Sequence, residues 1–307
     1  MVSIIKKQLK KSDCIKNIYL HIVKDIFSLL YAISPALASR YLYRRSTGKK
    51  LNLKNPKDFN EKLQWLKLYW QHPLVVKCAD KYTVREYVEN CGCGEILNEL
   101  YDVYEDTSQI TWDNLPQKFA IKCTHGCGFN VICVDKSKLD KDQTINKLDT
   151  WLKIKYGRYV GESHYDKMKP RIICERYIET DAGLLPNDYK IYCFNGKPEF
   201  VLVCGNRNTE LTLHFMDSNW LPMNIGIDKF SKGDTPVKPD SFNLMFEFAE
   251  KLAAPFPFVR VDFYDFNGKP LLGEMTFTPA GCQATYYSEY GLNRLGELLV
   301  LPEKYAV

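Results

Sequence analysis

The chain has 307 residues, a formal net charge of +5, 45% hydrophobic residues and 26% charged residues. This composition is ordinary for a soluble globular protein, and the length is sufficient for two or three packed units around a sizeable core. The positive charge is mild. It does not by itself indicate nucleic acid as a partner, because nucleic-acid binding calls for a concentrated basic face, and we expect no such partner.

The eleven cysteines are scattered along the chain, and none of them forms the Cys-x-x-Cys spacing of a zinc site. Their number is odd and no secretory signal precedes them, so we expect reduced, mostly buried thiols in a cytoplasmic protein. A chance cluster of Cys123, Cys127 and Cys133 is the alternative.

Residues 1–54 predict a basic, amphipathic helical extension. Its apolar stretch, residues 18–42, is flanked by lysines and arginines, interrupted by charged residues and broken by Pro35, so it does not predict a transmembrane helix. Two interpretations stay open. Residues 1–50 either lie as helices on the anionic inner face of the cytoplasmic membrane or form a helical hairpin packed on the main domain.

Two helices and a strand are expected next. Asn60 is placed to cap the first helix, which Pro73 ends. The pair Asp80-Lys81 opens the second helix, expected from Tyr82 to Asn90. Residues 95–104 then indicate a short strand region.

A strand at residues 119–123 carries Lys122 and runs into a loop with Gly126 and Gly128. A lysine before a flexible glycine loop suits a triphosphate, because the ammonium can meet one phosphate while loop N–H groups bind others. The loop is not a Walker A loop, since no Gly-Lys-Ser/Thr follows and no helix starts there. A glycine hairpin with an edge lysine is the simpler alternative.

Residues 171–179 predict a strand that leads into a linker. A hairpin around Asn195-Gly196 follows, with Lys190 on its first strand. A helix is expected from about Phe242 to Leu252.

The most informative pattern is a β-hairpin around Asn267-Gly268. Side chains alternate along a strand, so Arg260 and Asp262 share one face. With a three-residue loop, Asp262 lies opposite Glu274, and Arg260 lies opposite Thr276. Two carboxylates would then converge beside a guanidinium and a hydroxyl, an arrangement that suits Mg²⁺. The alternative is a solvated hairpin face with incidental charges.

The order and intervals of these motifs resemble the ATP-grasp superfamily. Within it, the chain resembles the teichuronopeptide-synthesis (TupA-like) ATP-grasp family of bacterial capsule and cell-surface polysaccharide gene sets. The resemblance covers roughly residues 50–295 and rests on Asn60 to Trp65, Asp80-Lys81, Ile121 to Gly128, Asp188 to Lys190, Arg260 to Asp262 and Gly273 to Pro279.

The resemblance implies an α+β fold in which two subdomains grip ATP between antiparallel sheets, with a helical N-terminal extension. The implied divisions are the extension at 1–54, a pre-grasp region at 55–115, a first ATP-grasp subdomain with the glycine lid loop at 116–180, and a second with the metal site at 181–307.

The resemblance also implies roles for single residues. The catalytic set would be Lys122 at the α-phosphate, Lys190 facing the phosphates from the second half, and Arg260 at the transferred phosphoryl group. The remaining nucleotide contacts would come from the lid loop (His125, Gly126, Gly128), from the linker that holds adenine (Glu175, Arg176, Tyr177), and from Glu179 at the ribose. The metal ligands would be Asp262, Glu274 and Thr276, which stands where the superfamily usually has an asparagine.

The implied function is that of an ATP-dependent carboxylate–amine ligase that requires Mg²⁺ and forms an acyl phosphate. Its partners would be a sugar-acid or polysaccharide acceptor and an amino acid or amine. The alternatives are a glycosyltransferase or sugar kinase of polysaccharide biosynthesis, or a non-catalytic scaffold at the membrane surface. Arg207, His214 and Arg294 are candidates for binding the acceptor carboxylate by residue type alone.

Overall fold

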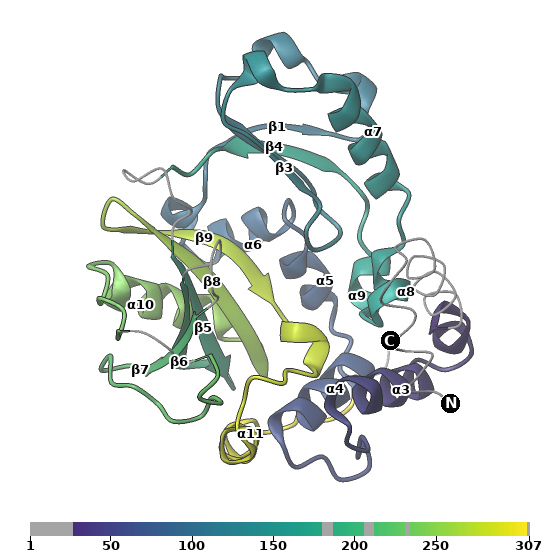
Figure 1. The fold of residues 1–307 in the computed structure, drawn as a ribbon, viewed down its shortest axis with the longest axis vertical. Helices are drawn as coiled ribbons and strands as arrows, with labels where there is room; N and C mark the ends of the chain where they lie inside the picture. The colour runs from purple at the N-terminus through teal and green to yellow at the C-terminus, as the bar shows by residue number, and fades with distance from the viewer. Residues whose placement is uncertain (1–26, 180–186, 206–211, 231–233, 306–307) are drawn as a thin grey trace.

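The computed structural model describes residues 27–179, 187–205, 212–230 and 234–305. These residues form helices and two antiparallel sheets, the α+β architecture that the sequence predicts (Figure 1). The smaller sheet has the strand order β1-β4-β2-β3. Its strands are β1 (Leu100–Tyr104), β2 (Phe119–Cys123), β3 (Asn130–Cys133) and β4 (Ile172–Arg176). Helix α7 (Lys141–Leu152) covers one face, because Leu148 packs into the same apolar cluster as Phe119 and Ile121.

The larger sheet has the strand order β7-β6-β5-β8-β9. Its strands are β5 (Asp188–Phe194), β6 (Lys197–Gly205), β7 (Thr212–Asp217), β8 (Phe258–Phe266) and β9 (Lys269–Thr276). Both faces carry apolar side chains, as the alternation along β8 illustrates. Val259 and Val261 join the cluster under helix α10 (Phe242–Ala253), whereas Phe258 joins the cluster under α4 (Phe59–Tyr69) and α11 (Glu289–Leu298).

Short helices connect the two sheets. They are α5 (Pro73–Ala79), α6 (Val84–Asn90), α8 (Tyr156–Val160) and α9 (Ser163–Asp166), and in Figure 1 α5 and α6 lie between the sheets. Single 3-10 turns occur at Gly94–Ile96, Thr107–Gln109, Trp112–Asn114, Lys136–Lys138 and Pro279–Cys282. Val75 and Val88 of α5 and α6 belong to the core of the larger sheet, so both helices are fixed to it.

The hairpin of β8 and β9 confirms the predicted register but not the predicted loop. Asp262 pairs with Glu274, and Arg260 pairs with Thr276, as expected. The turn, however, has two residues, Asn267 and Gly268, both with positive φ, and Phe266 pairs directly with Lys269. A bulge between Asp262 and Phe263 shifts the register by one residue, so Asp262 still pairs with Glu274.

Gly273 lies at this bulge. A Cβ atom there would lie 3.1 Å from the Tyr264 ring and 3.2 Å from the Asp262 carbonyl oxygen, so the close approach of the two strands favours glycine. Without the bulge, a two-residue turn would place Gly273 opposite Asp262 and move Glu274 out of the pair.

Other local predictions need smaller corrections. Asp58, not Asn60, caps helix α4 by accepting the N–H of Glu61, and the buried Asn60 amide instead donates to the carbonyl of Ala284. Pro73 begins helix α5, a position that suits its fixed φ. The hairpin at Asn195-Gly196 and the helix predicted from Phe242 are confirmed.

The N-terminal extension is helical where the structure describes it, over residues 27–33 and α3 (Pro35–Thr47), which Ser34 caps. The predicted basic segment before it, residues 1–26, lies outside the described residues. Within the part of the chain that is described, no helix is both long and apolar enough to cross a bilayer.

Candidate functional site

A cavity of about 340 Å³ lies where the two sheets face each other. The smaller sheet and its glycine loop contribute residues that include Ala120, Lys122, Gly128, Asn130, Ile132 and Arg176, and the larger sheet contributes residues that include Asp188, Lys190, Asp262, Tyr264 and Glu274. This volume falls within the range of small-molecule sites, which starts at about 300 Å³. We call this cavity the cleft.

The floor of the cleft holds a buried network of charges. The Arg260 Nε and Nη2 atoms donate to the two Asp262 carboxylate oxygens at 2.6 Å each. Lys190 of the neighbouring strand donates to Asp262 Oδ2 at 2.7 Å and also pairs with Asp188. Burial alone would lower the pKa of Lys190, but Asp262 and Asp188 raise it, so the lysine stays charged.

Glu274 extends this network toward the open side of the cleft. Its Oε1 accepts from the Thr276 hydroxyl at 2.9 Å and lies 3.3 Å from Arg260 Nη2, while the Thr276 oxygen accepts from Arg260 at 3.1 Å. Burial works to raise the pKa of Glu274, but Lys81, Arg260 and Lys190 outweigh it and lower that pKa to about 2. Glu274 is therefore ionised at neutral pH, and the side chain of Thr276 holds it in place.

Lys122 lies across the cleft on β2. Its ammonium bonds Glu175 Oε2 on β4 at 2.6 Å, and Arg85 lies 3.9 Å from the other carboxylate oxygen. Ala120 pairs with Glu175 and Lys122 pairs with Ile173, so Lys122 and Glu175 are diagonal neighbours on one face of the sheet. Burial alone would lower the pKa of Lys122, and Glu175 raises it.

The predicted lid loop is held by Lys81, whose Nζ donates to the Gly126 carbonyl at 2.7 Å. Gly128 has φ +76 and lines the cleft. His125 instead is buried below the loop, with Nε2 3.1 Å from the Trp151 carbonyl, and burial lowers its pKa. Of the three predicted loop residues, only Gly128 is among those that line the cleft.

The predicted linker is divided between two places. Arg176 and Tyr177 line the cleft where β4 ends, and the Arg176 guanidinium lies over the Phe266 ring, 5.0 Å from its centre. The Glu175 side chain points to Lys122, and Glu179 forms an exposed pair with Lys118 at 2.6 Å.

The acceptor candidates chosen by residue type do not gather at the cleft. Arg207 lies outside the described residues. Arg294 forms an exposed pair with Glu297 on α11 at 3.2 Å, and His214 lies on β7, at the far edge of the larger sheet from β8 and β9. Neither of these two lines the cleft.

Sequence reasoning assigned no site role to several residues that line the cleft, among them Lys81, Asn98, Asp188 and Tyr264. Two of them, Lys81 and Asp188, belong to the motifs Asp80-Lys81 and Asp188 to Lys190, on which the family resemblance rests. Asn98 had no such signal, because its amide reaches the Arg176 carbonyl at 2.9 Å only through the pairing of distant segments.

The carboxylates of Asp262 and Glu274 are the candidate ligands for Mg²⁺. Within the described ranges, no group of three or more His, Cys, Asp and Glu side chains is arranged to hold a metal ion. Two carboxylates, Asp262 and Glu274, do lie opposite each other and face the cleft. That number fits Mg²⁺, which usually takes one or two carboxylates and completes its shell with phosphates and water.

Two antiparallel sheets that face a cleft lined by lysines, an arginine and paired carboxylates are the arrangement expected of an ATP-grasp protein. The model of the TupA-like ATPgrasp family matches residues 61–300. This chain belongs to that family. None of the curated proteins matches the chain.

Solved structures with a similar fold include the L-amino acid ligase from Bacillus licheniformis, at 14% identity and a TM-score of 0.46, covering 73% of this chain and 49% of that one. The D-alanine–D-alanine ligase from Helicobacter pylori matches at 15% identity and a TM-score of 0.44, covering 79% and 69%. The Bacillus anthracis D-alanine–D-alanine ligase complexed with ATP matches at 13% and 0.38, covering 72% and 57%. The chain thus spans about half to two thirds of these proteins, and nothing about substrates follows at this level of similarity.

Proposed function

We propose that this protein is an ATP-dependent carboxylate–amine ligase. One observation carries the proposal: Lys122, Lys190, Arg260, Asp262 and Glu274, from four strands of two sheets, line or border a single cleft. A cluster of this kind suits a polyphosphate in transfer, because fixed cations stabilise the charge that develops on the phosphoryl group.

In this proposal the nucleotide enters between the sheets. Arg176 and Tyr177, at the end of β4, flank the base, and Lys122 and Lys190 meet the phosphates from opposite sides of the cleft. Both lysines are held by carboxylates in the structure. The phosphates would therefore replace the carboxylate partner of each lysine or share the lysine with it.

Asp262 and Glu274 would hold Mg²⁺. When bound, the metal would neutralise phosphate charge and orient the terminal phosphate. The low pKa of Glu274 keeps its carboxylate available as a ligand at neutral pH. The Thr276 hydroxyl, which bonds both Glu274 and Arg260, would position the ligand instead of binding the metal itself.

The proposed reaction has two steps. A carboxylate oxygen of the acceptor attacks the terminal phosphorus of ATP, the bond to ADP breaks, and an acyl phosphate forms. An amine nitrogen then attacks the acyl carbon, phosphate leaves, and the nitrogen loses a proton. Arg260 stabilises the phosphoryl group during transfer, and the loop at Gly126 and Gly128 excludes water that would hydrolyse the acyl phosphate.

We further propose that the acceptor is a sugar acid of a bacterial capsule or surface polysaccharide, and that the amine is an amino acid or a small amine. The chain's membership of the TupA-like family supports this assignment. The enzyme would act in the cytoplasm, next to the membrane where such saccharides are assembled.

A feature of the N-terminal extension supports membrane contact. Leu29, Ile33, Leu37 and Tyr41 recur every fourth residue and are all exposed, although they are apolar. Exposed arginines, Arg40, Arg44 and Arg45, accompany them. Apolar and basic side chains together suit an anionic lipid surface. Co-sedimentation with anionic vesicles should fall in high salt and in an Ile33→Asp/Leu37→Asp variant, and sedimentation insensitive to both would refute the contact.

The ligase assay follows from the chemistry. The protein is incubated with ATP, uronic-acid saccharides and pooled amino acids, and ADP release and acceptor mass are followed. We expect ADP only when both carboxylate and amine are present, with an acceptor mass that rises by the amine minus water. A gain of one hexose without ATP would instead identify a glycosyltransferase, and a gain of one phosphate would identify a sugar kinase.

A further inference from the structure

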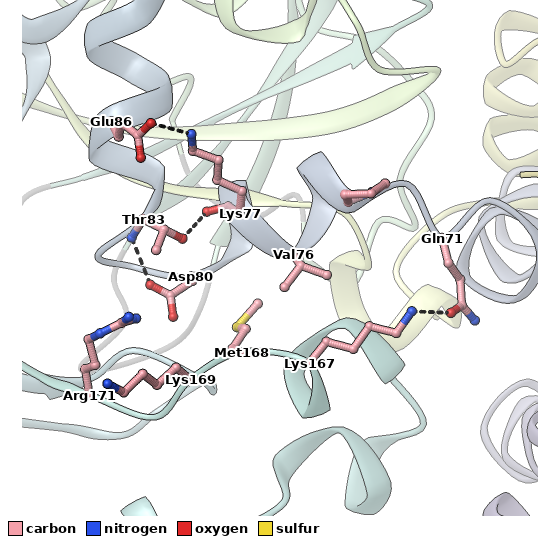
Figure 2. A pocket seen from close by; sticks show the side chains of 11 residues that line it. Gln71, Val76, Lys77, Asp80, Thr83, Glu86, Lys167, Met168, Lys169 and Arg171 are labelled. Atoms are coloured by element: carbon pink, nitrogen blue, oxygen red, sulfur yellow. Dashed lines mark hydrogen bonds and ion pairs between the residues drawn. The ribbon is translucent and has the colours of Figure 1, made fainter. Parts of the chain in front are cut away.

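A second hollow is lined by residues of helices α5 and α6 (Figure 2). It has a volume of about 560 Å³ and is bounded by α5, the start of α6 and residues 167–171. Asp80 lines this hollow, whereas the next residue, Lys81, lines the cleft. Consecutive residues of one turn thus face the two hollows. We call the second hollow the groove.

The groove is rimmed by cations. Lys77, Lys167, Lys169 and Arg171 line it, against two acidic side chains, Asp80 and Glu86. The lysines are held only by weak surface partners: Lys77 pairs with Glu86 at 2.9 Å, Lys167 with Gln71 at 3.0 Å, and Lys169 with Glu105. Exposed pairs of this kind contribute little free energy, so an anionic ligand can replace them.

The floor of the groove holds an unusual carboxylate. Asp80 is 2% exposed, and its Oδ1 accepts the backbone N–H groups of Tyr82 and Thr83 at 2.8 and 2.9 Å. Its Oδ2 is buried and has no hydrogen-bond partner among the residues that the structure describes. In Figure 2 the Asp80 oxygen without a dashed line is directed toward the segment that carries Met168 and Lys169. A buried carboxylate oxygen without a donor is costly, so this position favours a ligand that brings a hydroxyl or amine group.

The rest of the lining narrows the class of ligand. Pro73, Val76 and Met168 offer an apolar surface. No aromatic side chain lines the groove, so it offers no surface on which a nucleotide base could stack. A phosphate group alone would leave the apolar part of the lining uncovered. A sugar ring that carries hydroxyl groups and a carboxylate matches the apolar lining, the Asp80 oxygen and the rim cations together.

We infer that the groove binds a saccharide that carries carboxylate groups. The rim cations bind the carboxylates, the apolar floor contacts the ring faces, and a hydroxyl donates to Asp80 Oδ2. The identification of this saccharide as the acceptor rests on the proposed function; the binding itself does not. Because Asp80 lines the groove and Lys81 lines the cleft, the groove would hold a part of the saccharide other than the reacting carboxylate.

The experiment is calorimetry with trigalacturonic acid, without nucleotide, on the full chain. We expect binding to the wild type, none of neutral maltotriose, and a dissociation constant roughly tenfold higher after loss of the charged contacts in Lys167→Gln/Lys169→Gln. Asp80→Asn should weaken binding similarly, while its side-chain oxygen can still accept the backbone N–H groups of Tyr82 and Thr83. The matched control, Lys197→Gln/Lys251→Gln, removes two exposed lysines elsewhere on the molecule and should leave binding unchanged.

Three results would overturn the inference: no binding of trigalacturonic acid to the wild type, equal losses in the groove and control variants, or tighter binding of pyrophosphate than of the saccharide. Thermal melts of each variant show whether it is folded. Because no ATP is present, a protein that binds the saccharide but fails the ligase assay would contradict the proposed function and leave the groove assignment standing.

Discussion

Arg260 and Asp262, two residues apart on β8, form a buried bidentate ion pair with both distances at 2.6 Å. Lys190 adds a third contact to the same carboxylate from the adjacent strand. Asp262 is thus the common partner of two cations that would otherwise repel each other. The residue proposed to bind the metal therefore also holds these two cations together.

Asp262→Asn should therefore affect both stability and activity. Removing one member of a buried ion pair leaves the other charge uncompensated, which costs about 3–5 kcal/mol. We expect a loss of that order in the free energy of unfolding, measured with urea, together with loss of ADP formation. Glu199→Gln, which neutralises an exposed carboxylate on β6, is the control and should change neither. A stable, active Asp262→Asn variant would mean that this network is not the site.

Lys81 is predicted to hold the glycine loop closed. Its ammonium bonds the Gly126 carbonyl, and a hydrogen bond from a charged donor is worth about 1.5–3 kcal/mol. In Lys81→Met, we expect amide hydrogen exchange at residues 123–129 to rise roughly tenfold or more. Lys153→Met, at the exposed end of α7, should leave exchange unchanged. Unchanged exchange in both variants would show that the loop is held by its own packing.

Glu162 predicts a pH dependence of stability. Burial raises its pKa from 4.5 to about 7, despite the opposing effects of Lys67 and Thr278. The folded protein therefore holds this proton to a higher pH than the unfolded chain does, so stability is lost as pH rises from about 4.5 to about 7. Relative to Glu162→Gln, the wild type should lose about 2–3 kcal/mol between pH 4.5 and 8.

Denaturant unfolding at both pH values measures this difference, and comparison of the two slopes removes any constant effect of the substitution. If the wild type and Glu162→Gln lose stability in parallel, Glu162 does not titrate in this range.

The sequence was informative where short-range rules determine the structure. Asn267-Gly268 and the alternation along β8 were enough to place Asp262 opposite Glu274. The predicted three-residue loop was wrong: the turn has two residues, and a bulge at Gly273 restores the pairing. An isolated glycine within a strand indicates such a bulge, so Gly273 was the local signal for it. Positive φ at both turn residues explains the two-residue turn, which the Asn-Gly pair favours.

The sequence did not predict which strands pair when they lie far apart in the chain. Lys190 meets Asp262 because β5 pairs with β8, although the two residues are 72 positions apart. Glu175 meets Lys122 because β4 lies beside β2. The alternation of side chains along a strand predicts only which face of the sheet a charged residue occupies. Which strand lies next to it is decided by the packing of the whole sheet.

The most direct test of the central claim is calorimetric titration of Mg-ATP into the wild type, Lys122→Ala and the control Lys197→Ala. We predict that the wild type and the control bind alike, and that Lys122→Ala binds at least about tenfold more weakly, because a charge-assisted contact to phosphate is lost. A thermal melt of Lys122→Ala shows whether Glu175, which loses its partner, leaves the fold intact. Equal affinity of Lys122→Ala and the wild type, or no binding of Mg-ATP by the wild type, would contradict the assignment of the cleft.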